Sequence, residues 1–200
     1  MIAFDRLTWM RQRLLDLSEP TPEWWAFVRK HCIDLQTIIP DCGSLTIARC
    51  TAVDTIDGQY VFDFTADGVP CVVIEGLLIG KCGSARELLT LDIIAWPIHS
   101  PEHFASAMGP GAGVALLGPV AAFRVPSDNT PIKLYRNPES WLLNGCEGSV
   151  ALKPEAAEWL NTSKVPLICE DVEHARCVSQ MLGWDANKRD IFIPKIRRVA

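Results

Sequence analysis

The chain has 200 residues, of which 48% are hydrophobic and 22% are charged, and its formal net charge is −5. This composition is typical of one globular domain, or one domain with an appendage, and it excludes a disordered chain. The negative charge excludes a general attraction to nucleic acid or to anionic membranes, so any basic surface must be local.

The first residues do not resemble a signal peptide, because Asp5 and Arg6 interrupt the apolar run early. No apolar run reaches the roughly 18 residues that span a bilayer. We therefore expect a cytoplasmic protein without a membrane partner. Eight cysteines are present, but no two have C-x-x-C spacing. We expect them to be free structural thiols rather than disulfides or zinc ligands.

The first elements in the chain are predicted to be two helices. Residues 5–17 place four apolar side chains on one helical stripe. A second helix begins at Thr21, which can cap it, with Pro22 in its first turn. Its expected buried face consists of Trp24, Phe27, Val28 and Cys32. Trp25 falls partly off that face, and it is either buried at the helix edge or a residue that contacts a partner.

The next segments have the periodicity of strands. Residues 44–53 and 59–66 are expected to form a hairpin, and residues 69–79 form a third strand. This third strand is almost entirely apolar, so we expect it to be covered on both faces. Helical pattern returns over residues 84–97, and a further helix is predicted over residues 100–108.

The last third of the chain alternates strands with helices. Strands are predicted at 131–136, 148–153, 165–170 and 190–196, with helices between them. Short links between such elements indicate parallel strands. We therefore expect an α/β or α+β fold, with N-terminal helices and antiparallel strands followed by a small parallel βαβαβ unit. The predicted parts are 1–125 and 126–200, with a boundary near 124–131, or one compact domain.

The segment VPLICEDVEHARCVSQML, residues 165–182, contains the strongest candidate for chemistry. Glu170 and Asp171 follow a predicted strand, where open parallel sheets bind ligands, and His174 lies one turn later. These three side chains could hold a divalent metal or share acid/base catalysis. Asp171 is equally well placed to cap the following helix. The cations expected at neighbouring strand ends are Lys153 and Lys195.

Three other patterns are weaker. The glycines of residues 109–118 suggest a phosphate loop, but a predicted helix precedes them and no Gly-Lys-Ser/Thr follows, so a helix stop and loop is the better interpretation. His99 and His103 are separated by a predicted helix start, which argues against a zinc pair. Cys146 lies between glycines that could expose it, yet a turn cysteine without a catalytic role is favoured.

A basic patch near the C-terminal end of the sequence could contact phosphates or an acidic partner. Together with Trp25, these residues form the predicted binding surface for a protein or a nucleic acid: Lys188, Arg189, Lys195, Arg197 and Arg198. A solvated terminus is the competing interpretation.

The segments SARELLTLDIIAWP, NPESWLLNGCEGSVAL and CEDVEHARCVSQML resemble small bacterial proteins associated with prophages and mobile elements, a group without an established activity. The resemblance covers residues 84–194 and implies a context in which small proteins act by binding macromolecules. We therefore expect a non-enzymatic accessory or binding protein that requires no cofactor. The alternative is a metal-dependent hydrolase or nuclease-like enzyme acting on phosphoester or nucleotide substrates, which would use Glu170, Asp171 and His174.

Overall fold

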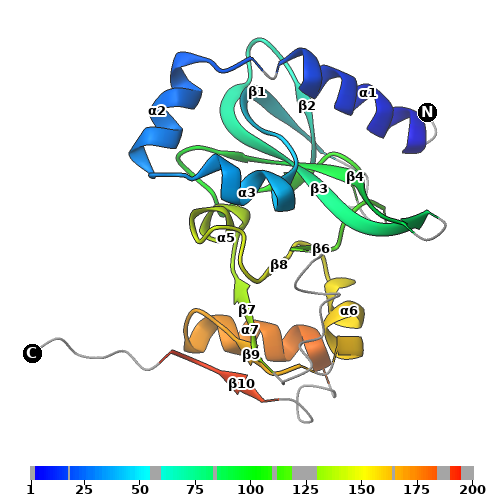
Figure 1. Ribbon diagram of the computed structural model, residues 1–200, viewed down its shortest axis with the longest axis vertical. Coiled ribbons are helices and arrows are strands. Elements are labelled where there is room, and N and C mark those ends of the chain that lie inside the picture. The colour runs from blue at the N-terminus through cyan, green and yellow to red at the C-terminus, as the bar shows by residue number, and fades with distance from the viewer. Residues whose placement is uncertain are drawn as a thin grey trace, which may run out of the picture.

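The computed structural model describes residues 3–17, 19–54, 60–82, 85–109, 112–118, 130–163, 165–183 and 190–194. Within these residues, six helices and two sheets form an α+β fold (Figure 1). The helices are α1 (Ala3–Asp16), α2 (Pro22–Lys30), α3 (Leu35–Cys42), α5 (Pro138–Leu143), α6 (Ala156–Ser163) and α7 (Val172–Leu182). The strands are β1 (Leu45–Asp54), β2 (Tyr60–Phe64), β3 (Val69–Cys82), β4 (Ala85–Pro97), β5 (Ala105–Ser106), β6 (Leu116–Leu117), β7 (Ile132–Tyr135), β8 (Ser149–Ala151), β9 (Leu167–Ile168) and β10 (Ile191–Phe192).

The N-terminal sheet has the order β2-β1-β3-β4-β5, and all its neighbouring strands are antiparallel. The long strands β3 and β4 form its centre. Their register shifts between Gly76 and Leu77. A side chain at position 76 would be crowded, because its Cβ would lie 3.0 Å from the Cβ of Asp92. Glycine therefore allows the irregular part of β3 to pass close to Asp92.

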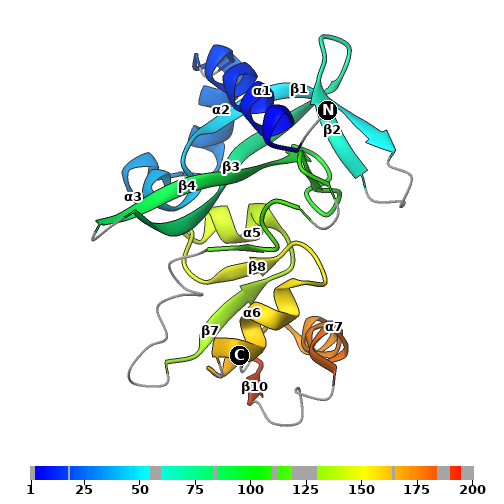
Figure 2. The same ribbon diagram turned by 90° about the vertical axis from the view of Figure 1, so that its right-hand side faces the viewer.

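Helices cover both faces of this sheet. On one face, Met10 and Leu14 of α1 pack against Val73 of β3. On the other face, α2, α3 and α5 share a core with Val72 and Ile74. The apolar third strand is therefore buried on both faces, as its sequence predicts. Figures 1 and 2 show α5 between this sheet and the rest of the C-terminal part.

The N-terminal sheet curls until its two edges lie side by side, with β2 close to β5. Arg6 of α1 bridges them. Its guanidinium donates to the carbonyl of Ala107 at 2.7 Å and to that of Phe62 at 2.9 Å. It also pairs with Asp63 at 3.0 Å. The first helix thus ties together segments that are 45 residues apart in the chain (62 to 107).

The second sheet has the order β10-β9-β7-β8-β6. Strands β7, β8, β9 and β10 run parallel, which confirms the predicted parallel unit, and β6 joins antiparallel to β8. Helix α5 lies on the face toward the first sheet, whereas α6 and α7 pack on the opposite face with Leu134 and Leu167. The chain leaves β7 toward one side and later crosses to the other. The carboxyl ends of β7 and β9 therefore flank a topological switch point, where ligands bind in open α/β sheets.

The two parts of the chain share a core. Strand β6 precedes the expected boundary yet belongs to the second sheet, and α5 follows that boundary yet packs with α2 and α3. Residues 119–129 lie outside the described residues, so the boundary itself stays a prediction. Within the described residues, no helix has the length and apolar character needed to cross a membrane.

Two predicted helices are wrong. Most of the first segment, Ala85–Pro97, forms β4, which pairs with β3 along its length. The segment is apolar on both sides, a pattern that suits a central strand as well as a buried helix, and Ile93 and Ile94 favour the strand. Residues 100–108 form one turn, in which the N–H of His103 donates to Ser100, followed by the short strand β5. The helix signal of Ser100 and Pro101 thus marks a turn.

The first two helices follow their prediction closely. Met10 and Leu14 are buried, and the side chain of Thr21 accepts the N–H of Trp24 as the predicted cap. The exception is Cys32, which is exposed although its spacing places it on the buried face. Helix α2 ends at Lys30, and Cys32 adopts a positive φ of 52°, so the helical spacing no longer applies to it.

Candidate functional site

Asp171 caps α7, as one of the two interpretations of its position predicts. Its backbone is extended, and its carboxylate accepts the N–H of His174 at 2.9 Å. This bond satisfies one of the free amides in the first turn. The bond holds the pKa of Asp171 below its usual value, and the Arg136 guanidinium lowers that pKa further. The carboxylate therefore has a structural task before any chemical one.

Arg136, which directly follows β7, is the central cation of the site. Its backbone N–H donates to Glu170 at 2.9 Å, and its guanidinium donates to Asp171. The guanidinium also lies 3.8 Å from Glu170 and 3.9 Å from Glu173. The bond with Asp171 raises the pKa of Arg136. All three carboxylates that follow β9 thus share one cation from the neighbouring strand.

The sequence reasoning missed Arg136. It took Lys153 and Lys195 as the strand-end cations, although Arg136 also ends a predicted parallel strand. The signal was available, because β7 is the first strand of the unit and must lie beside a later one. What the sequence did not show is that β9, the strand that Glu170 and Asp171 follow, pairs directly with β7.

His174 is buried and belongs to the same site. Its Nδ1 atom accepts the backbone N–H of Glu170 at 3.3 Å. Burial lowers the pKa of His174, so the neutral ring is favoured and carries its proton on Nε2. The ring lines a cavity of about 280 Å³ together with Arg136 and Cys177. The predicted trio of Glu170, Asp171 and His174 therefore does come together, around an arginine that was not predicted.

The arrangement limits the chemistry of the trio. A divalent cation would compete with the Arg136 guanidinium for the same carboxylates. Among the described residues, no three His, Cys, Asp or Glu side chains converge in a way that could hold a metal ion. The residues that line the cavity include Arg136 and His174, whose guanidinium and Nε2–H are hydrogen-bond donors. Such a site suits the binding of an acceptor better than the transfer of a proton.

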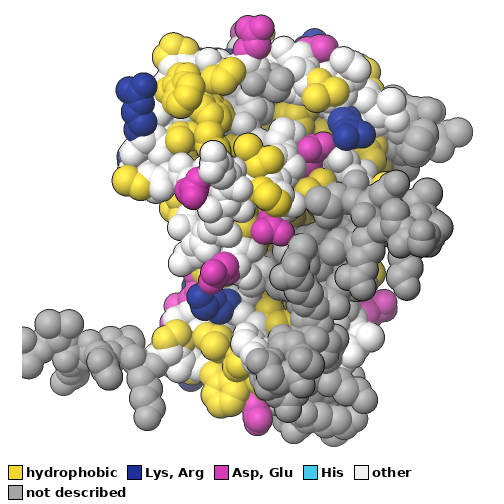
Figure 3. Space-filling view, viewed as in Figure 1, with side chains coloured by type: hydrophobic (Ala, Val, Ile, Leu, Met, Phe, Trp, Pro, Cys, Tyr) yellow, Lys and Arg dark blue, Asp and Glu magenta, His cyan; other side chains and the backbone are white. Residues whose placement is uncertain are grey.

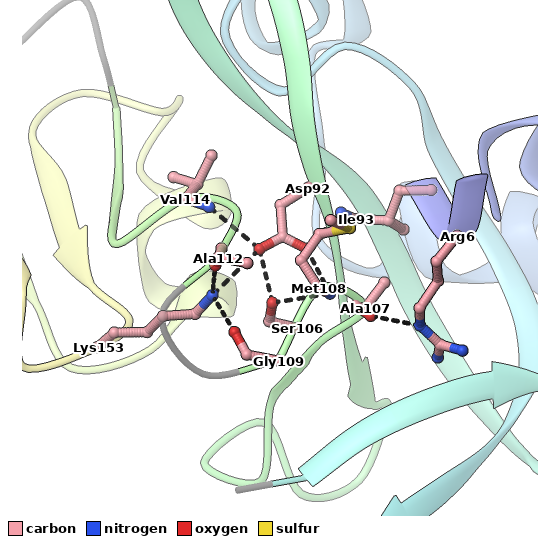
Figure 4. A network of polar contacts seen from close by, with 10 residues as sticks. All are labelled: Arg6, Asp92, Ile93, Ser106, Ala107, Met108, Gly109, Ala112, Val114 and Lys153. Carbon is pink, nitrogen blue, oxygen red and sulfur yellow. Dashed lines mark hydrogen bonds and ion pairs between the residues drawn. The ribbon is translucent and has the colours of Figure 1, made fainter. Parts of the chain in front are cut away.

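A second polar network joins the two sheets (Figure 4). Asp92 of β4 is fully buried and accepts hydrogen bonds from the Ser106 hydroxyl at 2.6 Å and from the backbone N–H of Val114 at 3.1 Å. Lys153, which follows β8, reaches Asp92 at 3.4 Å. Its ammonium also donates to the carbonyl of Gly109 at 2.8 Å. Burial raises the pKa of Asp92, and Lys153 acts against this rise.

The glycine-rich segment serves this network. Gly113 has a φ of +71°, and a Cβ there would lie 2.1 Å from the Asp92 carboxylate. The carbonyls of Gly109 and Ala112 accept hydrogen bonds from Lys153. Carbonyl oxygens that surround an ammonium make a cation site, the opposite of the cradle of N–H groups that a phosphate needs. The described part of this segment is therefore a loop that holds a lysine and leads into β6, which agrees with the loop part of the interpretation. The helix-stop part is wrong, because a turn and β5 precede the segment in place of the expected helix.

Cys146 and Cys169 are poorly suited to act as nucleophiles, because the pKa of each thiol is raised. The described thiols, which comprise residues 32, 42, 50, 71, 146, 169 and 177, are free. Cys146 is buried, contrary to the idea that its glycine neighbours expose it. Burial raises the pKa of Cys169 to about 11, so its reactive thiolate is scarce at neutral pH. Only Cys32 and Cys177 are exposed among the described residues.

The predicted binding surface is described in part. Trp25 is 45% exposed on α2, which favours the contact interpretation over burial at the helix edge. The basic residues near the C-terminal end lie outside the described residues, so their role stays a prediction: Lys188, Arg189, Lys195, Arg197 and Arg198.

Comparisons with known proteins add no identity. No family model, no curated protein and no solved structure matches this chain.

Proposed function

We propose that this protein is a non-enzymatic binding protein that contacts a protein partner through the outer face of α2. This face is defined by Trp25, Arg29 and Lys30, which are all exposed. Figure 3 shows hydrophobic side chains gathered over α2 at the upper left, with Lys and Arg side chains at their edge. The observation that carries the proposal is that Trp25 is exposed and yet held in place.

Two neighbours hold Trp25. Its ring packs edge-on against Trp24, with 4.8 Å between ring centroids and an interplanar angle of 87°. Trp24 is itself buried, and its indole N–H donates to the carbonyl of Leu45 at 2.8 Å. On the other side, the Arg29 guanidinium lies 5.8 Å from the centroid of the Trp25 ring. Trp25 therefore loses little conformational freedom when a partner covers it.

The residue types match those that dominate binding energy in protein interfaces. Tryptophan and arginine are enriched among the few side chains whose truncation weakens a complex most. Arg29 and Lys30 favour an acidic rim on the partner. A protein is a better partner than a nucleic acid, because the chain carries a net charge of −5 and repels phosphate backbones at long range. The mobile-element context implied by the sequence resemblance agrees with a binding role.

The geometry gives less support to the alternative, a metal-dependent hydrolase. Its proposed carboxylates, Glu170 and Asp171, are already paired with Arg136, and Asp171 also caps α7. A metal ion would have to displace Arg136 from both carboxylates. The binding proposal requires no such rearrangement.

The test is a quantitative pull-down from a lysate of the source organism, with the full chain as bait. Trp25→Ala and Arg29→Ala should each lose a specific protein that the unchanged chain retains, with Trp25→Ala weakening binding about thirtyfold. Trp159→Ala is the matched control, because Trp159 is 42% exposed on a different helix, α6. Retention of the same proteins by all variants would overturn the proposal. So would retention of single-stranded nucleic acid that depends on Trp25.

A further inference from the structure

The cavity at the switch point is lined by Arg136 and His174, which have hydrogen-bond donors without a partner among the described residues. It has a volume of about 280 Å³ and opens beside the end of β7. Its lining mixes polar and apolar side chains, which are Tyr135, Arg136, Ala151, His174, Cys177, Val178 and Met181. Ligand sites commonly combine apolar walls with a few polar groups in this way. The volume is just below the usual range for such sites, about 300–1,000 Å³, so the ligand must be small.

His174 offers a hydrogen-bond donor at the cavity. The side chain is 9% exposed, and its Nδ1 atom is occupied by the Glu170 N–H. The remaining ring proton is therefore on Nε2, and no described residue accepts a hydrogen bond from it. A ligand with an acceptor atom in this cavity could receive a hydrogen bond from that ring N–H.

Arg136 also has donors to spare. Its guanidinium has five N–H groups, but among the described residues its one side-chain hydrogen bond runs from Nη2 to Asp171. Glu170 and Glu173, at 3.8 and 3.9 Å, are near enough for charge attraction but too far for hydrogen bonds. The Nε and Nη1 groups thus remain available for a planar acceptor with two oxygens.

We propose that this cavity binds a small organic carboxylate with a short apolar body. The carboxylate would accept hydrogen bonds from Arg136 and from Nε2 of His174, and the apolar body would pack against Val178 and Met181. A single negative charge suits the site, because a doubly charged phosphate would meet stronger repulsion from Glu170, Asp171 and Glu173. This site is separate from α2 and does not depend on the proposed partner.

The probe is isovalerate, tested by calorimetry and ligand-observed NMR against its neutral amide and against inorganic phosphate. Isovalerate should bind, whereas the amide and phosphate should bind at least about tenfold more weakly. Arg136→Met should weaken isovalerate binding about tenfold or more. Equal binding of the amide, or tighter binding of phosphate, would overturn the carboxylate assignment.

Asp171→Asn gives the sharper result, because its expected effect has the opposite sign. Asn keeps the cap of α7 but releases Nη2 of Arg136 and removes a nearby negative charge. Isovalerate should therefore bind several-fold tighter, and the melting temperature should change little. Glu102→Gln, an exposed acid far along the chain, is the control and should leave binding unchanged. Weaker isovalerate binding in Asp171→Asn, together with lost affinity for a divalent cation, would show a cation site instead and overturn the proposal.

Discussion

Two polar networks in this molecule use the same chemistry in opposite surroundings. Around Asp92, one carboxylate and one ammonium are buried between the sheets, and backbone groups such as the N–H of Val114 and the carbonyl of Gly109 hydrogen-bond to them. Around Arg136, three carboxylates share one guanidinium at a surface open to water. The first arrangement leaves no group available to a ligand. The second leaves donors unused and a cavity beside them.

The difference lies in what each pair costs when it is broken. A buried ion must be compensated at all times, so the Asp92 network has to be complete in the folded chain. Exposed pairs contribute little to stability because water and salt screen them. The buried Asp92 network therefore serves stability, whereas the exposed groups around Arg136 can exchange their partners for a ligand at low cost.

The largest expected effect comes from removing the buried cation. Lys153→Met leaves the Asp92 carboxylate buried without an opposite charge, and the free energy of unfolding should fall by about 3–5 kcal/mol, as measured by urea denaturation. The double variant Asp92→Asn/Lys153→Met should lose less than Lys153→Met alone, because it contains no unpaired buried charge. A double variant that loses the sum of both single effects would contradict this account.

The same network should respond to one added carbon atom. In Gly113→Ala the new Cβ collides with the Asp92 carboxylate, and the positive φ of 71° adds backbone strain. Gly183→Ala is the matched control, since Gly183 has a φ of 61° but open space around its Cβ position. The control should cost about 1 kcal/mol, and Gly113→Ala about 2 kcal/mol more. Equal losses would mean that the carboxylate moves aside freely.

The smallest effect concerns pH and the exposed network. Burial lowers the pKa of His174 in the folded chain, so the unfolded chain binds more protons between this pKa and the ordinary value near 6.5. The free energy of unfolding therefore does not depend on His174 above about pH 6.5, and it falls as the pH drops toward the lowered pKa. In His174→Asn, the side-chain oxygen can replace Nδ1 as the acceptor. The melting temperature should then vary less with pH in this range. His103→Asn, at an exposed site, should leave it unchanged.

Much of the fold could be predicted from the sequence where the local pattern and the tertiary environment agree. The cap by Thr21, the stripe containing Met10 and Leu14 and the parallel strands all follow from local rules. The helix predicted over residues 84–97 was wrong, because a strand buried on both faces lacks the alternation of polar and apolar residues that distinguishes it from a helix. For the site, Asp171 and His174 were found from spacing. Arg136 was missed, because the order of the strands cannot be read from their sequence.

Arg6 has a consequence for self-association. The edges of an antiparallel sheet attract other strands, and proteins must block them to avoid aggregation. Here the blocking groups belong to α1, where Arg6 occupies the carbonyls of Phe62 and Ala107. A fragment that begins at α2 would keep the sheet but expose these carbonyls and the apolar face that Met10 and Leu14 cover. Shortened versions of this chain should therefore retain α1 if they are to remain monodisperse in solution.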